Sequence, residues 1–288
     1  LREKQYELSC RMFGESDGNT LLTAANLALT YGTRGEIARE REIEEQVYLQ
    51  MCKSLGEEDP NTLTVLQNLI VSCDSLGDHV REAELRKKLY ELRCKMLGEE
   101  HPDTLLTLHN LALTYRDLKE YPKAVELLEK AYELRSRVLG EEHPDTLKTL
   151  NGIAGVYDKQ GDHRRELELR EKVYELRSRT LGEEHPDTLL ALHNLAVTYR
   201  DLEDYPGAAE MLERVFALRR RVLGGDHPDT LVSQAALART YMLQGDNECA
   251  LRLYEQVYEA RCRVLGPDHE RTVQTRERIE ELRGGSES

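Results

Sequence analysis

Leu-Gly-Glu-Glu-His-Pro-Asp-Thr-Leu occurs three times without change, at residues 97–105, 139–147 and 181–189. Its glycine also recurs outside these copies, and each step, such as that from Gly98 to Gly140, is 42 residues. The full set is Gly14, Gly56, Gly98, Gly140, Gly182, Gly224 and Gly266. Self-similarity at a fixed period of this length predicts an array of stacked structural units, in which each unit packs only on its neighbours.

The first half of the unit at 98–139 predicts a helix that begins after Pro102. Asp103 and Thr104 are residue types that cap helix N-termini, since their side chains accept backbone N–H groups. The apolar residues that follow have the spacing of one helix face. They are Leu105, Leu108, Leu111, Ala112 and Tyr115.

The second half of the unit predicts another helix. The apolar pattern breaks at residues 119–121, and Pro122 fits the first turn of a helix, where a missing N–H costs little. Gly140 is expected to end this helix as a left-handed cap. The apolar positions between them are Ala124, Leu127, Leu128, Ala131, Tyr132, Leu134 and Val138. Each unit is thus predicted to be a helical hairpin.

A single hairpin cannot bury both of its apolar faces, so consecutive hairpins must stack. We therefore predict an all-α, right-handed superhelical solenoid. Two aromatic columns in repeat register are interpreted as packing between repeats rather than as a platform for stacking bases. The second-helix column is Tyr6, Tyr48, Tyr90, Tyr132, Tyr174, Phe216 and Tyr258, and the first-helix column is Tyr31, Tyr115, Tyr157, Tyr199 and Tyr241.

The repeat register predicts one solenoid over residues 1–288. It consists of a partial helix at 1–13, six full repeats at 14–55, 56–97, 98–139, 140–181, 182–223 and 224–265, and a capping helix within 266–288. Leu1 is in register with Leu127, so the chain is expected to open partway through a second helix and to be part of a longer protein. We expect a monomer, or weak association through the truncated N-terminal end.

Seven positions of one unit carry a family resemblance: Leu108, Leu111, Ala112, Tyr115, Ala124, Leu128 and Ala131. Their spacing resembles the tetratricopeptide repeat, and the 42-residue period with His-Pro-Asp-Thr resembles the kinesin light chain type of that repeat. Other units depart from the pattern. Glu40, Glu82 and Glu166 replace Ala124, while Glu44, Arg86 and Arg170 replace Leu128, so those second helices are expected to pack differently.

Composition argues against several partners and compartments. The net charge is −14, whereas nucleic-acid backbones and anionic membranes attract basic proteins. No apolar run approaches the roughly 20 residues of a membrane-spanning helix, and no signal peptide opens the chain. Cys10, Cys52, Cys94 and Cys262 share a register that elsewhere holds serine or arginine. These cysteines are therefore interpreted as free thiols, which favours a cytoplasmic protein.

The Glu-Glu-His part of the repeated stretch contains the residue types of acid–base catalysis. We interpret it instead as a structural joint, because Asp59 replaces the histidine in one copy and a turn lacks a pocket that excludes water. Known phosphate-binding, zinc-protease and serine-hydrolase motifs are absent, so we predict no enzyme activity, no metal and no cofactor. A basic column near the ends of the second helices is expected to pair with glutamates four residues earlier, such as Glu133. Its members are Arg11, Lys53, Lys95, Arg137, Arg179, Arg221 and Arg263.

The resemblance implies that the first helices line a concave face that binds extended or helical peptides. Asparagine and glutamine can bond the main chain of such a ligand, leucine can supply apolar contact and arginine can read charge. The predicted site residues are Asn26, Gln67, Asn68, Leu106, His109, Asn110, Arg116, Asn151, Leu190, His193, Asn194 and Arg200. The asparagines could instead bond neighbouring helices.

These patterns favour a non-enzymatic scaffold that binds a peptide or a segment of a partner protein. The alternative is a regulatory array of a larger signalling ATPase or protease, whose catalytic part lies outside this chain. A purely structural spacer is a further alternative.

Overall fold

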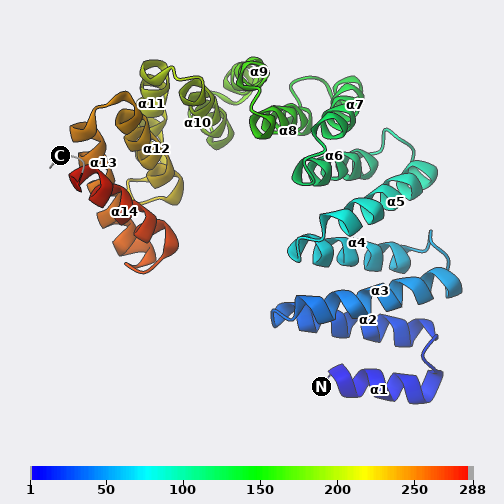
Figure 1. Cartoon of the computed structure of the whole chain (residues 1–288). Helices are drawn as coiled ribbons and strands as arrows, with labels where there is room; N and C mark the ends of the chain where they lie inside the picture. The colour runs from blue at the N-terminus through cyan, green and yellow to red at the C-terminus, as the bar shows by residue number, and fades with distance from the viewer. Residues whose placement is uncertain (1, 285–288) are drawn as a thin grey trace. The chain divides into compact units, whose positions relative to one another are not determined.

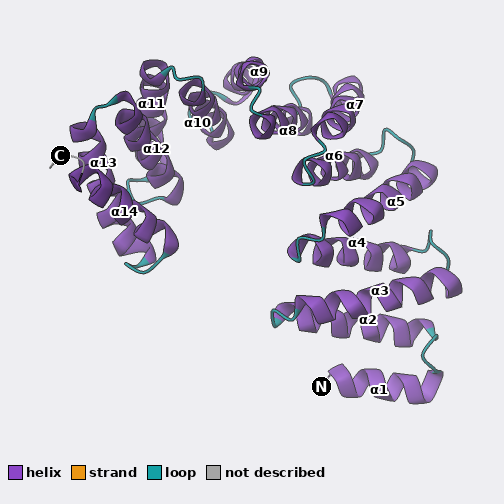
Figure 2. Ribbon diagram, viewed as in Figure 1, coloured by secondary structure: helices purple, strands orange, loops and turns teal. Residues whose placement is uncertain are grey.

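A computed structural model describes residues 2–284 and shows that this part of the chain is all-α, with 14 helices and no strand (Figure 2). Short loops join consecutive helices into hairpins. The helices are α1 (Arg2–Phe13), α2 (Gly18–Thr33), α3 (Ile37–Ser54), α4 (Pro60–Ser75), α5 (His79–Leu97), α6 (Pro102–Asp117), α7 (Tyr121–Leu139), α8 (Pro144–Gln160), α9 (His163–Leu181), α10 (Pro186–Asp201), α11 (Tyr205–Leu223), α12 (Pro228–Gln244), α13 (Asn247–Leu265) and α14 (Glu270–Gly284).

The chain divides into two compact units, Leu1–Gly152 and Ile153–Ser288, and the division falls within α8. In the first unit, each helix from α1 to α7 packs against the next one, as a solenoid requires (Figure 1). The second unit repeats this arrangement from α9 to α14. First helices of adjacent hairpins also touch, α2 with α4 and α10 with α12. Leu1 and residues 285–288 lie outside the described residues, so the proposed register of Leu1 and the end of the capping helix stay predictions.

The buried core follows the positions that carried the resemblance. Leu108, Leu111, Ala112 and Tyr115 on α6 are all at most 7% exposed. On α7, Ala124, Leu128 and Ala131 have no exposed surface. Each buried methylene contributes about 0.8 kcal/mol to folding, so these two faces hold the hairpin together. The small residues on α7 allow close approach of the helices.

The aromatic columns pack between repeats, as predicted. Lys88 on α5 lies 5.9 Å from the ring centre of Tyr48 on α3, and Lys130 on α7 lies 5.7 Å from that of Tyr90 on α5. Each lysine thus reaches the second helix of the preceding hairpin. Within a hairpin, Lys123 stands 3.7 Å from the ring centre of Tyr115. Cations over aromatic faces add roughly 0.5–1 kcal/mol each where they are exposed.

Gly140 ends α7, but not in the left-handed helical conformation that was predicted. Its φ of 93° is positive, whereas its ψ of 159° is far from that of a left-handed turn. Closely similar angles recur at Gly98, Gly182, Gly224 and Gly266. This region of backbone space is essentially restricted to glycine, which explains why the repeat keeps glycine at the joint.

The basic column pairs with a different partner from the one predicted. Lys95 pairs with Glu58, Arg137 with Glu100, Arg221 with Glu184 at 2.5 Å and Arg263 with Asp226 at 2.8 Å. Each acid lies in the joint of the preceding repeat, so the bridges connect neighbouring hairpins. The prediction of pairing within one helix, for example with Glu133, was wrong because the stacked joint brings a carboxylate closer. All these side chains are largely exposed, so each bridge contributes little.

All six cysteines are free thiols, in agreement with their interpretation from the sequence. Among the described residues, no helix combines the length and the apolar character that crossing a bilayer requires.

Candidate functional site

The histidine of the repeated stretch caps the first helix of the next hairpin. His101 Nδ1 accepts a hydrogen bond from the backbone N–H of Asp103 at 3.2 Å. The same bond forms at His143, His185, His227 and His269, at 3.1–3.2 Å. The joint is therefore structural, as interpreted, but the predicted capping residues, Asp103 and Thr104, were wrong. The helix begins at Pro102, one residue earlier than a cap at Asp103 allows.

The carboxylate of Glu82 on α5 forms the centre of a buried polar cluster. It accepts hydrogen bonds from Arg86 Nε at 2.7 Å and from Thr114 Oγ1 at 2.8 Å, and its other oxygen lies 2.9 Å from His79 Nδ1. These contacts lower the pKa of Glu82 despite its burial, and the carboxylate raises the pKa of His79. The glutamate that departed from the repeat pattern thus joins α5 to α6 through a polar contact.

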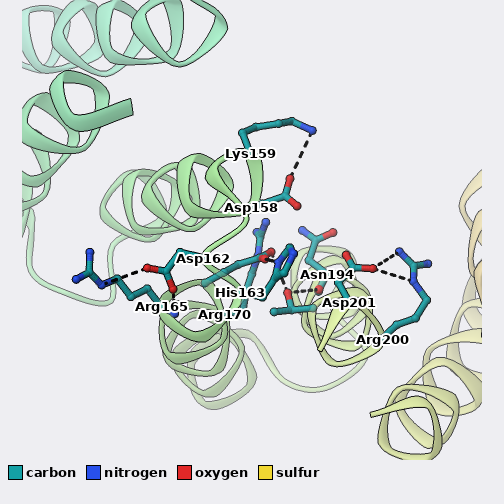
Figure 3. A network of polar contacts seen from close by, with 11 residues as sticks. Asp158, Lys159, Asp162, His163, Arg165, Arg170, Asn194, Arg200 and Asp201 are labelled. Atoms are coloured by element: carbon teal, nitrogen blue, oxygen red, sulfur yellow. Dashed lines mark hydrogen bonds and ion pairs between the residues drawn. The ribbon is translucent and has the colours of Figure 1, made fainter. Parts of the chain in front are cut away.

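The second unit contains the same cluster, 84 residues further along the chain. Glu166 accepts from Arg170 Nε at 3.4 Å and from Thr198 Oγ1 at 2.9 Å, and it lies 3.0 Å from His163 Nδ1. Figure 3 shows His163 and Arg170 beside this carboxylate. Contact with Glu166 raises the pKa of His163. The period of 84 residues therefore reflects an alternation of apolar and polar second helices.

Two groups of described residues have ligand atoms close enough for a metal ion: Asp74, His79 and Glu82, and Asp158, His163 and Glu166. In each group the histidine Nδ1 already faces the glutamate. Each glutamate is also bonded to an arginine and a threonine. A cation would compete with these partners, so the geometry is that of a closed hydrogen-bond network.

Glu44 on α3 lacks the partners of this cluster. It is 1% exposed, and only one of its oxygens, Oε2, has a partner, the hydroxyl of Ser72 at 2.8 Å. Burial raises the pKa of Glu44 to about 7, and the nearby Glu40 acts in the same direction. The cluster in α5 holds Arg86 at the corresponding position, whereas α3 has two carboxylates instead of a glutamate and an arginine.

The predicted peptide-contacting asparagines have free side-chain amides. Asn68 on α4, Asn110 on α6 and Asn194 on α10 are partly exposed. None of their side-chain amides forms a hydrogen bond within the described residues, so bonding to a neighbouring helix does not explain them. Leu106 and Leu190 lie one turn before Asn110 and Asn194 and are 40% and 44% exposed.

The other predicted residues differ in accessibility. Asn26 is exposed on α2, while Gln67 on α4 and Asn151 on α8 are partly buried. Arg116 pairs with Asp117 at 2.9 Å, and Arg200 pairs with Asp201 at 3.0 Å. These two guanidinium groups are therefore partly neutralised by their own helices.

His109 does not present an open surface. It is 2% exposed, its Nδ1 has no hydrogen-bond partner, and its ring lies against the Cα of Gly152, where an added Cβ would stand 3.2 Å from Cε1. Burial, together with Arg135, lowers its pKa to about 4. Burial and Arg219 likewise lower the pKa of His193 to about 4, so both rings are neutral near pH 7. His109 thus belongs to the packing beneath the surface.

The second unit has a hollow of about 500 Å³ on the face of its first helices. Of the predicted residues it contains His193 and Arg200, and it does not contain Leu190 or Asn194. The sequence analysis missed most of its charged lining, which is Arg239, Arg261, Arg271, Arg278 and Glu277. One signal was present in the sequence, since Arg271 stands where the repeated stretch has aspartate.

Comparisons with known proteins agree with the fold. Family models described as tetratricopeptide repeat match residues 84–137, 103–176, 188–229 and 230–271. A crystal structure of nearly identical TPR-like repeats, described as those of a putative kinesin light chain of Podosopora anserina, is 32% identical, with a TM-score of 0.63. The match covers 71% of this chain and 97% of that one. No curated protein matches the chain in sequence.

More distant structures share the fold alone. BtubC (BKLC) from P. vanneervenii is 21% identical with a TM-score of 0.65, over 80% of this chain and 92% of that one. A tetratricopeptide repeat protein from Parabacteroides merdae is 15% identical with a TM-score of 0.57, over 92% and 94% of the two chains. From the repeat register, the hairpin core and these matches, the chain belongs to the tetratricopeptide repeat family, with repeats of the kinesin light chain type.

Proposed function

We propose that this protein is a non-enzymatic scaffold that binds a peptide, or a segment of a partner protein, on the face formed by its first helices. Tetratricopeptide repeats are in general protein-interaction modules, and the matched families indicate no catalytic activity. The observation that carries the proposal is the set of free, partly exposed amides of Asn68, Asn110 and Asn194. In mid-helix, asparagine lowers helix propensity, so a recurrent asparagine without an intramolecular partner favours a role in binding.

The chemistry of this face suits a main-chain ligand. An amide offers both donors and an acceptor, so it can bond the peptide groups of an extended segment of any sequence. Leu106 and Leu190 supply exposed apolar surface one turn away. Such a combination of polar and apolar groups is typical of peptide recognition. We infer a protein or peptide ligand, and neither a nucleic acid nor a membrane, because the net charge is −14.

Two features of this proposal rest on the sequence alone. A cytoplasmic location is inferred from the six free cysteines. The alternative function, a regulatory array of a larger ATPase or protease, would use the same face for an intramolecular segment.

The proposal is tested by selecting displayed peptides on the native protein and measuring their affinity for two doubly substituted variants. The test variant is Leu106→Ala with Asn110→Ala. The control variant is Gln46→Ala with Leu49→Ala, which removes a matched amide and a matched exposed leucine from the second helix α3. Circular dichroism and thermal melting establish that both variants are folded.

We expect the selected peptides to bind the test variant roughly tenfold more weakly, since a lost hydrogen bond and lost leucine contact cost about 1–2 kcal/mol together. Binding to the control variant should not change. Equal loss in both variants, or unchanged affinity in the test variant, would place the ligand elsewhere. A selection without any enriched peptide would favour a spacer or an intramolecular role.

A further inference from the structure

The hollow in the second unit is lined by three arginines that the repeat does not require. Arg239 is in register with Val197, and Arg271 with Asp229. Arg278 is in register with Ala236 and, one repeat earlier, with Asn194. The preceding hairpins fold with aspartate or with small and neutral residues at these positions, so packing does not demand a cation there. Nevertheless, all three departures line the same hollow.

The packing of α13 against α14 fixes one wall of the hollow. Arg261 on α13 donates through Nη1 to Thr275 Oγ1 at 2.6 Å and to the carbonyl oxygen of Arg271 at 3.0 Å. Burial lowers the pKa of Arg261, and the neighbouring charge of Arg271 acts in the same direction. The buried guanidinium thus holds the first turn of α14, which carries Arg271, against the second helix of the last full hairpin.

Several of these cations lack an intramolecular counter-ion. Neither Arg239 nor Arg271 forms an ion pair within the described part of the chain. Arg278 pairs with Glu281 at 2.6 Å, but its side chain is half exposed. The charges of Arg278, Arg239 and Arg200 all act on the phenol of Tyr254, opposing the rise in its pKa that burial causes. Three guanidinium groups from three helices therefore converge on one buried ring.

The local charge is opposite to that of the whole protein. Among the described residues that line the hollow, Glu277 is the only carboxylate, against Arg200, Arg239, Arg261, Arg271 and Arg278. The protein carries a net charge of −14. Arginine forks match carboxylate and phosphate groups in a bidentate geometry. A volume of about 500 Å³ lies within the range of ligand-binding pockets and is enough for a few side chains.

We infer that this hollow selects an anionic peptide, in which glutamate, aspartate or phosphoserine side chains meet Arg239, Arg271 and Arg278. The inference rests on the proposed function, because it names the kind of peptide that the first-helix face of the second unit takes. The first unit contributes nothing to this selection. Its positions in register with Arg271, such as Asp103 and Asp145, are acidic.

The test reverts the three arginines to the residues of earlier repeats. The variant is Arg239→Val, Arg271→Asp and Arg278→Asn, and each new residue already occurs in the same register of a folded hairpin. Arg271→Asp also restores a carboxylate at a helix N-terminus, which the helix dipole favours. The control is Arg220→Ser, which reverts an exposed arginine of α11 outside the hollow to the serine at Ser178. Fluorescence anisotropy measures binding of a short labelled glutamate-rich peptide, its phosphoserine counterpart and its glutamine counterpart.

We expect both anionic peptides to bind the native protein, with an affinity that falls as salt rises, and the reverted variant to bind them at least roughly tenfold more weakly. The Arg220→Ser variant should bind like the native protein. The inference is wrong if the glutamine peptide binds as well as the anionic ones, or if the reversion leaves anionic binding unchanged. In either case the proposed function stands. If anionic peptides do not bind while selected neutral peptides do, the inference alone fails, whereas failure of every selected peptide removes the proposed function.

Discussion

His101 Nδ1 lies 3.2 Å from the backbone nitrogen of Asp103 and accepts its hydrogen bond, so the imidazole ring caps α6. Asp59 occupies the same register one repeat earlier and accepts from Asn61 and Thr62 at 2.8 Å and 3.3 Å. Imidazole and carboxylate are thus interchangeable at the joint. This exchange explains why a stretch containing glutamate and histidine recurs without forming a catalytic site.

Substitution at His185 tests the capping role. His185→Ala should lower the free energy of unfolding by about 1 kcal/mol, because the first turn of α10 loses its acceptor. His185→Asp should stay within about 0.5 kcal/mol of the native protein, since aspartate is a good cap. Urea unfolding measures both. Equal destabilisation by alanine and aspartate would contradict the capping role and indicate a function of imidazole itself.

Glu44→Gln is expected to stabilise the protein above neutral pH. The pKa of Glu44 is raised to about 7 in the folded state from an ordinary 4.5. Between these two values the unfolded chain releases a proton that the folded protein keeps, so native stability falls as pH rises from 4.5 to 7. Glutamine keeps an acceptor for Ser72 and carries no charge. At pH 8 the gain in unfolding free energy should be on the order of 1–3 kcal/mol.

Urea unfolding from pH 4 to pH 8 measures this effect, with Glu42→Gln as the control, because Glu42 is exposed on the same helix. The gain should vanish near pH 4, where the carboxyl group is protonated in both states. A gain that is independent of pH would show that the charge of Glu44 is not its cause.

The buried pair of Glu166 and Arg170 should be replaceable as a pair but not singly. Glu166→Ala leaves Arg170 buried with its carboxylate partner removed, and it should cost about 3–5 kcal/mol. The double variant Glu166→Ala with Arg170→Leu instead reproduces the combination that α7 already carries in the same register, at Ala124 and Leu128.

That double variant should be within about 1 kcal/mol of the native protein or more stable than it, because well-packed apolar residues replace buried ion pairs without loss. Chemical unfolding of the single and double variants gives the coupling energy directly. Additive effects of the two substitutions would show that the pair does not act as a unit.

His109 should make the protein sensitive to acid. Its pKa is lowered to about 4 from 6.5, so the unfolded chain takes up a proton between these values while the folded protein does not. Its contribution to stability is therefore complete above pH 6.5 and is lost as the pH falls toward 4, by on the order of 3 kcal/mol. His109→Gln, which copies Gln67 in register, should flatten this part of the profile. An unchanged slope between pH 6.5 and 4 would contradict the assignment.

Repetition made the helical hairpin predictable from the sequence, because every apolar position was observed several times in the same register. The buried pairs Leu108–Ala112 and Ala124–Leu128 followed from that spacing. Local backbone chemistry was harder to predict. Histidine is not a common cap, so Asp103 seemed the better choice, and the ψ of Gly140 depends on the path of the following joint.

The candidate site was predictable only where it follows the repeat. Asn110 and Asn194 recur in register, and their free amides agree with the role given to them. His109 also lies in that register, but the helix buries it, and spacing alone does not distinguish a surface position from the position next to it. Arg239 and Arg278 were missed because they depart from the repeat, whereas a column is recognised by the residues that recur in it.

The most direct test of the proposed binding function is the affinity of a selected peptide for the native protein and for the variant with Leu190→Ala and Asn194→Ala. This pair lies on α10, where both side chains reach the surface of the second unit. We predict a fall in affinity of roughly tenfold, with no change for Gln46→Ala and Leu49→Ala. Unchanged affinity in this variant, together with unchanged affinity when Leu106 and Asn110 are replaced, would contradict the assignment of the first-helix face as the binding surface.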